Sequence, residues 1–328
     1  MAKTAFVTGA SGFTGSHLCR RLVERGDQVR ALVRPNSKTA ALSGLDLQLV
    51  HGDLANGSLP TRALRGVDVV YHVAAAYRTE RVPARYFFDV NANGTSLLLK
   101  AAMDADVGRF VHFSTVGVLG DIKAPPANEA APHNPHDTYQ ESKLEGELRV
   151  LSAFKEQALD GVVVRPTGIY GPGDTRFLKL FRAIDRGIFW MIGRGNPLFH
   201  LIYIDDLIDG VILAGEREEA LREVFILGGE EYVTIRQLVE MIAEVLGRTV
   251  PDRHVPLWPV MLIAKVCQRL CRPLGIEPPI YPRRLDFFTV SRAFEIAKAK
   301  RLLGFQPKVD LKTGLTRTAD WYRQNKLL

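Results

Sequence analysis

The stretch Thr8-Gly9-Ala10-Ser11-Gly12-Phe13-Thr14-Gly15 lies between a short apolar run and a segment with helical character. A strand, a glycine-rich turn and a helix in this order are the context in which glycine spacing indicates dinucleotide binding. Gly9 permits the tight turn, Gly12 lets the backbone approach a pyrophosphate, and Gly15 lets the helix and strand pack closely. The unpaired amides at the start of the helix favour a phosphate at the same place.

The composition narrows the classes of protein that this chain can represent. Its 328 residues are 46% hydrophobic and 24% charged, which is ordinary for a globular protein of one large domain or two smaller ones. The net charge of +7 suits an anionic cofactor or an anionic membrane surface. No basic stripe with interleaved aromatic residues is present, which argues against nucleic acid as a partner.

Cysteine content and hydropathy predict the compartment. Cys19, Cys267 and Cys271 do not form a disulfide framework, and no nearby His or further Cys completes a metal site. The first apolar run is too short for a signal peptide, and no run reaches the length of a membrane span. We therefore expect a cytoplasmic protein without a metal.

Strands that alternate with helical segments predict the fold. The expected strands after the glycine turn are 28–33, 47–50, 67–73, 109–114 and 161–165. Such alternation requires crossover connections, and so a Rossmann-type doubly wound parallel sheet of the α/β class. The predicted domains are a dinucleotide-binding domain at 1–167, to which 200–228 returns, and a smaller, mostly helical substrate domain at 168–199 and 229–328. Near the end of the chain, a helix capped by Ser291 is expected to stop near Gly304.

The tip of the second strand bears on the choice of cofactor. An Asp or Glu at this place would bind the ribose hydroxyls of NAD, whereas an Arg suits the 2′-phosphate of NADP. The sequence here is Val33-Arg34, and no acid follows before Asp46. Because a guanidinium binds phosphate in a bidentate manner, Arg34 favours NADP over NAD. The alternative is that Arg34 is a solvated strand end.

Two later segments predict the chemistry. Ala74-Ala75-Ala76 ends the fourth strand, where small residues allow a ligand to lie over the backbone or a helix to pack closely. Tyr139 and Lys143, four residues apart, share one face of a predicted helix. The ammonium can stabilise the phenolate and lower the tyrosine pKa, so that the hydroxyl can exchange a proton with a substrate oxygen. By itself this spacing is also common on ordinary helix surfaces.

The segment 255–274 is unusually apolar. Its polar residues form one stripe, at Lys265, Gln268, Arg269 and Arg272. About thirteen helical residues span roughly 20 Å, which is too short to cross a bilayer. The wide apolar face with basic edges could lie on a membrane, line an apolar substrate pocket or pack against its own domain.

With these residues identified, the chain resembles the extended short-chain dehydrogenase/reductase family, which includes nucleotide-sugar epimerases, dihydroflavonol reductases and 3β-hydroxysteroid dehydrogenases. The resemblance covers essentially the whole chain. It rests on the T-G-x-x-G-x-x-G motif, on Asp53, on the N-x-x-G-T motif that begins at Asn91, on Thr115, and on the Y-x-x-x-K pair Tyr139 and Lys143. It implies that Tyr139 is the acid/base, that Lys143 also contacts the nicotinamide ribose, and that Thr115 holds the substrate oxygen.

The motifs and the resemblance together assign the remaining site residues. The expected cofactor contacts are Gly9, Ser11, Gly12, Phe13, Gly15, Arg34, Asp53, Leu54, Ala74, Ala75, Asn91, Lys143 and Pro166. The expected substrate-pocket residues are Ala76, Ser114, Thr167, Gly168 and Phe199, and Ser114 is the alternative to Thr115 at the substrate oxygen.

Two departures from the nucleotide-sugar members bear on the substrate. Those members typically carry Asn where this chain has Gly168, and an Arg that meets the substrate diphosphate where this chain has Phe199. Without the amide and the cation, a diphosphate loses its binding groups. The segments 165–172 and 255–274 look more like the steroid dehydrogenase branch, and the Val33-Arg34 tip looks like the dihydroflavonol reductase branch.

We therefore expect an NAD(P)-dependent oxidoreductase that interconverts a secondary alcohol and a ketone on an apolar, sterol-like skeleton. One alternative is a nucleotide-sugar epimerase or dehydratase with tightly held NAD. Another is a cofactor-binding redox sensor without catalysis, which would have no need of Thr115, Tyr139 and Lys143. The family resemblance also implies a homodimer, and the segment 255–274 allows peripheral contact with a membrane.

Overall fold

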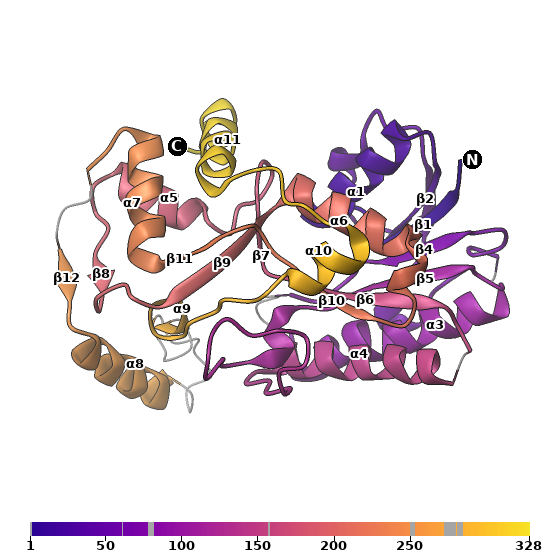
Figure 1. The fold of residues 1–328 in the computed structure, drawn as a ribbon, viewed down its shortest axis with the longest axis horizontal. Helices are drawn as coiled ribbons and strands as arrows, with labels where there is room; N and C mark the ends of the chain where they lie inside the picture. Colours follow the sequence, from indigo (N-terminus) through magenta and orange to yellow (C-terminus); the bar gives the residue numbers. More distant parts are fainter. Residues whose placement is uncertain are drawn as a thin grey trace.

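The structure is a computed structural model that describes residues 2–60, 62–77, 82–156, 158–249, 253–271, 280 and 285–328. The molecule is elongated, with a large sheet and the N-terminus toward one end and a smaller part built from later segments toward the other (Figure 1).

The large sheet has seven parallel strands. They are β1 (Thr4–Thr8), β2 (Gln28–Val33), β3 (Gln48–His51), β4 (Val69–His72), β5 (Arg109–Phe113), β6 (Gly161–Pro166) and β10 (Val224–Leu227). Their spatial order is β10-β6-β5-β4-β1-β2-β3, and every neighbouring pair is parallel. This confirms the predicted doubly wound parallel sheet.

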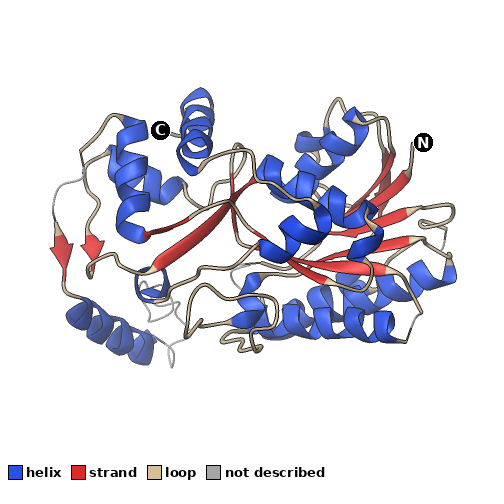
Figure 2. Ribbon diagram, in the orientation of Figure 1, coloured by secondary structure: helices blue, strands red, loops and turns tan. Residues whose placement is uncertain are grey.

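Helices cover both faces of this sheet (Figure 2). One face packs against α1 (Phe13–Glu24), α6 (Ile204–Glu216) and α10 (Ala297–Leu303), and the other against α3 (Gly94–Asp104) and α4 (Thr138–Lys155). Every residue of β4, β5 and β6 is buried, because both faces of a covered parallel sheet must be apolar. The two layers of side chains form separate hydrophobic clusters, with Val7 in one and Phe6 in the other.

The smaller part contains two short sheets and several helices. Its strands are β7 (Gly168–Tyr170), β9 (Leu198–Tyr203) and β11 (Tyr232–Thr234) in one sheet, and β8 (Met191–Ile192) and β12 (His254–Val255) in the other. Its helices are α5 (Leu178–Asp185), α7 (Ile235–Leu246), α8 (Leu257–Cys271), α9 (Asp286–Thr289) and α11 (Leu311–Gln324).

Short helical turns complete the chain. They are α2 (Ala84–Phe88), the π-helical η3 (Asp89–Asn93), and the 3-10 turns η1 (Ala40–Leu42), η2 (Leu54–Asn56), η4 (Val116–Leu119) and η5 (Glu218–Ala220).

The structure divides the segment 200–228 in a way that local sequence does not show. β10 pairs with β6 in the large sheet, whereas β9 pairs with β7 and β11 in the small one.

The expected Ser291 cap is wrong. The helix that ends at Gly304 begins at Ala297, and the Ser291 hydroxyl accepts a hydrogen bond from the Leu198 amide instead.

Helix α8 occupies most of the apolar segment 255–274, of which residues 272–274 lie outside the described part of the chain. Within the helix only Ala264 is buried, and large apolar side chains such as Leu262 and Ile263 are more than half exposed. The wide apolar face therefore does not pack into its own domain. None of the helices in the described ranges has the length and hydrophobicity of a transmembrane span.

Candidate active site

A cavity of about 630 Å³ opens at the carboxyl edge of the large sheet. The strand order reverses between β1 and β4, and open α/β sheets bind ligands outside the strand ends at such a point. Most of the site residues expected from sequence line this cavity, namely Gly9, Ser11, Gly12, Phe13, Gly15, Arg34, Asp53, Leu54, Ala74, Ala75, Ala76, Ser114, Thr115, Tyr139, Pro166 and Thr167.

The glycine loop is packed so tightly that side chains are excluded. Gly9 has a φ of +67°, and a Cβ atom there would lie 2.7 Å from the Ala74 amide nitrogen. A Cβ atom on Gly15 would lie 2.1 Å from the Gly9 carbonyl oxygen. Gly12 is the N-cap of α1 and has no side chain with which to cap it, so amides of the first turn remain as donors beside the cavity.

A buried chain of hydrogen bonds fixes the end of β4 beneath the cavity. The Ala74 amide donates to the Thr8 hydroxyl at 3.1 Å, and that hydroxyl lies 2.9 Å from His72 Nδ1. His72 Nε2 in turn lies 2.9 Å from the Thr95 hydroxyl, which donates to the Asn91 carbonyl. Burial lowers the pKa of His72 to about 3, so its ring is neutral and serves as a structural link between strand and helix.

Tyr139 lies in the first turn of α4, and its side chain faces Thr115 at the end of β5. The Thr115 hydroxyl is near enough to the Tyr139 hydroxyl to affect its pKa, and the Thr115 oxygen accepts the Gly117 amide at 3.0 Å. The ring of Tyr77 meets that of Tyr139 edge to face, with the ring centres 4.9 Å apart. Desolvation raises the pKa of the Tyr139 hydroxyl above its usual value of 10, and the nearby Thr115 hydroxyl opposes the increase.

Lys143 differs from its expected arrangement. Its Nζ donates to the Phe113 carbonyl at 2.5 Å, and the side chain is 2% exposed, behind the lining of the cavity. Burial lowers the lysine pKa from 10.5 to about 8, and the Glu147 carboxylate opposes the decrease. The predicted lowering of the tyrosine pKa is therefore absent from this structure, because the ammonium is bonded to the backbone of β5 instead of facing Tyr139.

Ser114 is committed to a buried charged network. Its hydroxyl donates to the Glu147 carboxylate, which Arg165 also binds through Nε at 3.2 Å and through Nη2. Arg165 further lies 2.8 Å from His133 Nε2. The proton of the Ser114 hydroxyl is therefore already donated within the protein.

Asn91 lies behind the cavity, so the structure does not place it among the lining residues where a cofactor contact was expected. It is fully buried, and its side-chain oxygen accepts the Ala76 amide at 2.8 Å. Its amide nitrogen donates to the Ser142 hydroxyl at 2.9 Å, and this hydroxyl donates to the Tyr139 carbonyl. Asn91 thus ties the end of β4 to the helix that carries the tyrosine.

Gly168 and Phe199 were expected in the substrate pocket, and the structure places both outside the cavity lining. The Phe199 ring packs edge to face on Phe287, with ring centres 5.3 Å apart, and on Phe177 at 6.2 Å. A Cβ atom on Gly168 would lie 2.8 Å from Leu201 Cδ2, so any side chain at this position would require Leu201 to shift.

The cavity also contains residues that sequence reasoning missed, among them Ser37, Tyr77, Tyr86 and Arg176. Arg176 pairs with Asp174 at 2.7 Å, donates to the Ile169 carbonyl and lies 5.6 Å from the centre of the Phe13 ring. The sequence gives no periodicity or spacing that separates these side chains from ordinary surface residues, since three of them lie in loops and Tyr86 lies in the five-residue helix α2.

The donors in the cavity fit a dinucleotide. The buried Thr167 hydroxyl lines the cavity and has no hydrogen-bond partner among the described residues, as expected of a group that a bound molecule satisfies. At the far end Arg34 is exposed and donates to the Tyr86 hydroxyl at 3.3 Å. Over the same described ranges, no three His, Cys, Asp or Glu side chains are grouped so as to hold a metal ion.

Comparison with known proteins agrees with this geometry. The model of the NAD dependent epimerase/dehydratase family matches residues 5–228. A 4-hydroxy-2-methyl-3-oxo-4-farnesyl-3,4-dihydroquinoline-1-oxide ketoreductase from Stigmatella aurantiaca is 32% identical, over 94% of this chain and 94% of its own length. A 3-beta-hydroxysteroid dehydrogenase from Mycolicibacterium neoaurum is 31% identical, over 96% of this chain and 90% of its own length.

A solved structure shows the same fold. The dTDP-glucose 4,6-dehydratase DesIV from Streptomyces venezuelae, with NAD and TYD bound, is similar with a TM-score of 0.78 at 29% identity. The similarity covers 98% of each chain.

Proposed function

Because this chain belongs to the NAD-dependent epimerase/dehydratase family of oxidoreductases, we propose that it interconverts a secondary alcohol and a ketone on an apolar substrate. The observation that supports this reaction is the single cavity that joins the glycine loop to Thr115 and Tyr139. The first-turn amides of α1 would hold the pyrophosphate, and Arg34 would hold the 2′-phosphate of NADP.

The proposed chemistry divides between the cofactor and the protein. A bound nicotinamide supplies or accepts the hydride. Tyr139 gives its hydroxyl proton to the substrate oxygen during reduction and takes it back during oxidation. Thr115 holds that oxygen beside Tyr139, and the raised tyrosine pKa keeps the hydroxyl protonated as a donor at neutral pH. The Lys143 ammonium would contact the nicotinamide ribose, which requires Nζ to leave the Phe113 carbonyl.

Two structural features and the names of two relatives favour an apolar substrate. The place where related nucleotide-sugar enzymes carry a cation is taken by Phe199, which belongs to an aromatic cluster with Phe177 and Phe287. The charge of Arg176 is matched by the buried carboxylate of Asp174. The names of two relatives, for a farnesyl-bearing ketone and for a 3-beta-hydroxysteroid, describe apolar compounds of this kind.

Replacing Tyr139 with Phe tests the reaction. The variant should bind NADPH like the unmodified protein and lose turnover of apolar ketones, followed by the loss of reduced-nicotinamide absorbance with a 3-ketosteroid as first probe. Tyr232→Phe is the matched control, since this tyrosine is 40% exposed and lies outside the cavity lining, and the variant should keep turnover. Turnover by Tyr139→Phe near the unmodified rate contradicts the proposal.

A nucleotide-sugar epimerase or dehydratase is the second candidate, and the likeness to the NAD-bound dehydratase DesIV favours it. Such an enzyme returns the hydride to the same molecule and so can keep its cofactor. The purified protein should therefore be denatured and any released nicotinamide measured. Stoichiometric NAD, with conversion of UDP-glucose or dTDP-glucose, would favour this candidate. An empty protein that binds NADPH reversibly would favour the dehydrogenase.

A further inference from the structure

Helix α8 presents an apolar face to solvent. The face consists of Trp258, Leu262, Ile263, Val266 and Leu270, which are between 49% and 72% exposed. All of them except Ile263 are spaced four residues apart and so lie on one side of the helix. Exposed apolar residues gathered in this way mark an interaction surface, whereas scattered ones do not.

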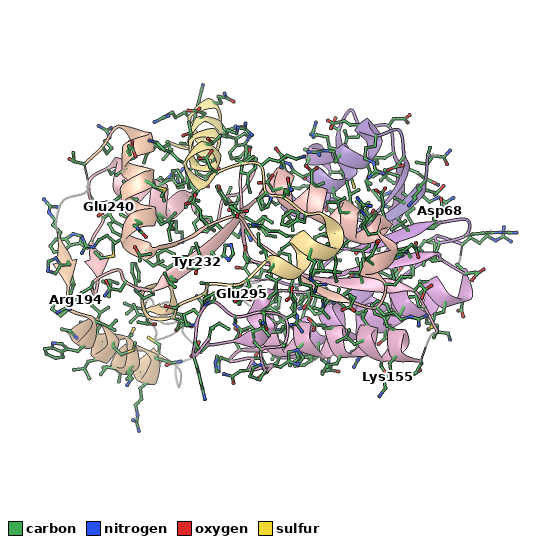
Figure 3. The ribbon with its side chains drawn as sticks, viewed as in Figure 1. Asp68, Lys155, Arg194, Tyr232, Glu240 and Glu295 are labelled. Carbon is green, nitrogen blue, oxygen red and sulfur yellow. The ribbon has the colours of Figure 1, made fainter. Side chains whose placement is uncertain are left out.

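The surroundings of this face are cationic. Lys265 and Arg269 are exposed along one edge of it, and the helix sequence contains no Asp or Glu. The turn at Gly193 and Arg194 lies near the start of the helix, since a Cβ atom added to Gly193 would lie 4.0 Å from Leu257 Cβ. This turn adds the cation of Arg194 to the surroundings of the face (Figure 3). Arg253, in the segment before the helix, lies 5.7 Å from the ring of the half-exposed Trp190.

The position of α8 leaves this face open to a broad surface. The helix lies at the end of the molecule away from the large sheet, at the lower left of Figure 1. Its fifteen residues extend about 22 Å, which suits a helix that lies along an interface and is too short to cross a bilayer.

From these features we infer that α8 docks the protein on the surface of an anionic lipid bilayer. The apolar face would enter the boundary between headgroups and acyl chains, with Trp258 at the level where indole rings are most stable. Lys265 and Arg269 would meet lipid phosphates or carboxylates. A bilayer of anionic lipid supplies hydrocarbon and negative charge side by side, which is the combination that this helix presents. The inference does not depend on the proposed reaction.

Co-sedimentation of the full chain with vesicles tests this inference. The protein should pellet with vesicles of phosphatidylcholine and phosphatidylserine, and should bind far less to phosphatidylcholine alone or at high salt. The double variant Leu262→Ser/Val266→Ser should weaken binding about tenfold or more, because two buried apolar side chains are lost. Lys265→Gln/Arg269→Gln should weaken binding to the anionic vesicles roughly 25-fold, at about fivefold for each charge.

Matched controls lie on α4, at the other end of the molecule. Leu148 is 49% exposed, the same fraction as Val266, and Leu148→Ser should leave vesicle binding unchanged. Lys155→Gln is the corresponding control for charge, and Figure 3 shows Lys155 far from α8. Thermal melting of every variant checks that the exposed substitutions leave the fold intact.

Three results would overturn the inference. One is that the unmodified protein stays in the supernatant with anionic vesicles. Another is that the α8 variants pellet as well as the controls do. The third is that the protein does not bind vesicles but forms a dimer that is lost in the Leu262→Ser/Val266→Ser variant. The apolar face would then pack against a second copy of the chain.

Discussion

Replacing Lys143 with Met should make the cofactor-free protein more stable at pH 7. The lysine is 2% exposed, and burial lowers its pKa from 10.5 to about 8. Below pH 8 the ammonium is charged in both the folded and the unfolded chain, so the folded state bears the full cost of burying it. At 1.36 kcal/mol for each pH unit between the two values, this cost is about 3 kcal/mol.

The variant also loses a hydrogen bond. The Phe113 carbonyl no longer receives the Nζ proton, which costs about 1 kcal/mol. The net expectation at pH 7 is a gain of about 2 kcal/mol in the free energy of unfolding. As the pH rises from 8 toward 10.5, the folded lysine loses its proton first and the unmodified protein becomes relatively more stable. The advantage of the variant should therefore shrink by about 2 kcal/mol by pH 9.5.

Urea unfolding of the two proteins at pH 7 and pH 9.5 measures this difference. The other ionisable groups are the same in both proteins, so their contributions to the pH dependence cancel in the comparison. Lys155→Met is the matched control, because Lys155 is an exposed lysine on the same helix and should show no pH-dependent difference. A Lys143→Met protein that is less stable than the unmodified one at pH 7, or a difference that does not change with pH, would refute this account of the buried ammonium.

Three further substitutions test the site. Gly15→Ala places a Cβ 2.1 Å from the Gly9 oxygen, so it should destabilise the loop by about 1–3 kcal/mol and weaken NADPH binding; unchanged melting and affinity would contradict the packing. Arg34→Ser should weaken NADPH about tenfold in a fluorescence titration and leave NADH unaffected; an equal loss for both cofactors would argue against a phosphate contact. Glu147→Gln leaves the buried guanidinium of Arg165 without its carboxylate, so the free energy of unfolding should fall by about 3–5 kcal/mol in chemical denaturation. A fall of less than about 1 kcal/mol would show that the ion pair is dispensable.

Much of the fold could be predicted because it is encoded locally. The glycine turn, the apolar strands and the helices between them each lie within a short stretch of sequence, and crossover connections then require a parallel sheet. The structure confirms this architecture. The pairing of β9 with β7 and β11 could not be predicted. Both partner strands have only three residues, and both are distant from β9 in the sequence.

The site was predicted less completely than the fold. Residues in fixed motifs, such as Gly12 and Tyr139, line the cavity as expected. The direction of the Lys143 side chain could not be inferred from its spacing to the tyrosine, since it depends on a carbonyl of another strand. Phe199 was expected in the substrate pocket, but its ring packs on Phe287 and lies outside the cavity lining, which the sequence around it does not reveal.

The place of β10 affects how the chain folds during synthesis. This strand covers one edge of β6, yet it leaves the ribosome roughly sixty residues after β6 does. At about 5–20 residues per second, the edge of β6 stays unpaired for several seconds while the chain of the smaller part is made. Such an edge is a template for pairing with other chains. A fragment that ends at residue 167 would keep this edge open permanently and should aggregate, although it contains the complete glycine loop and the tyrosine.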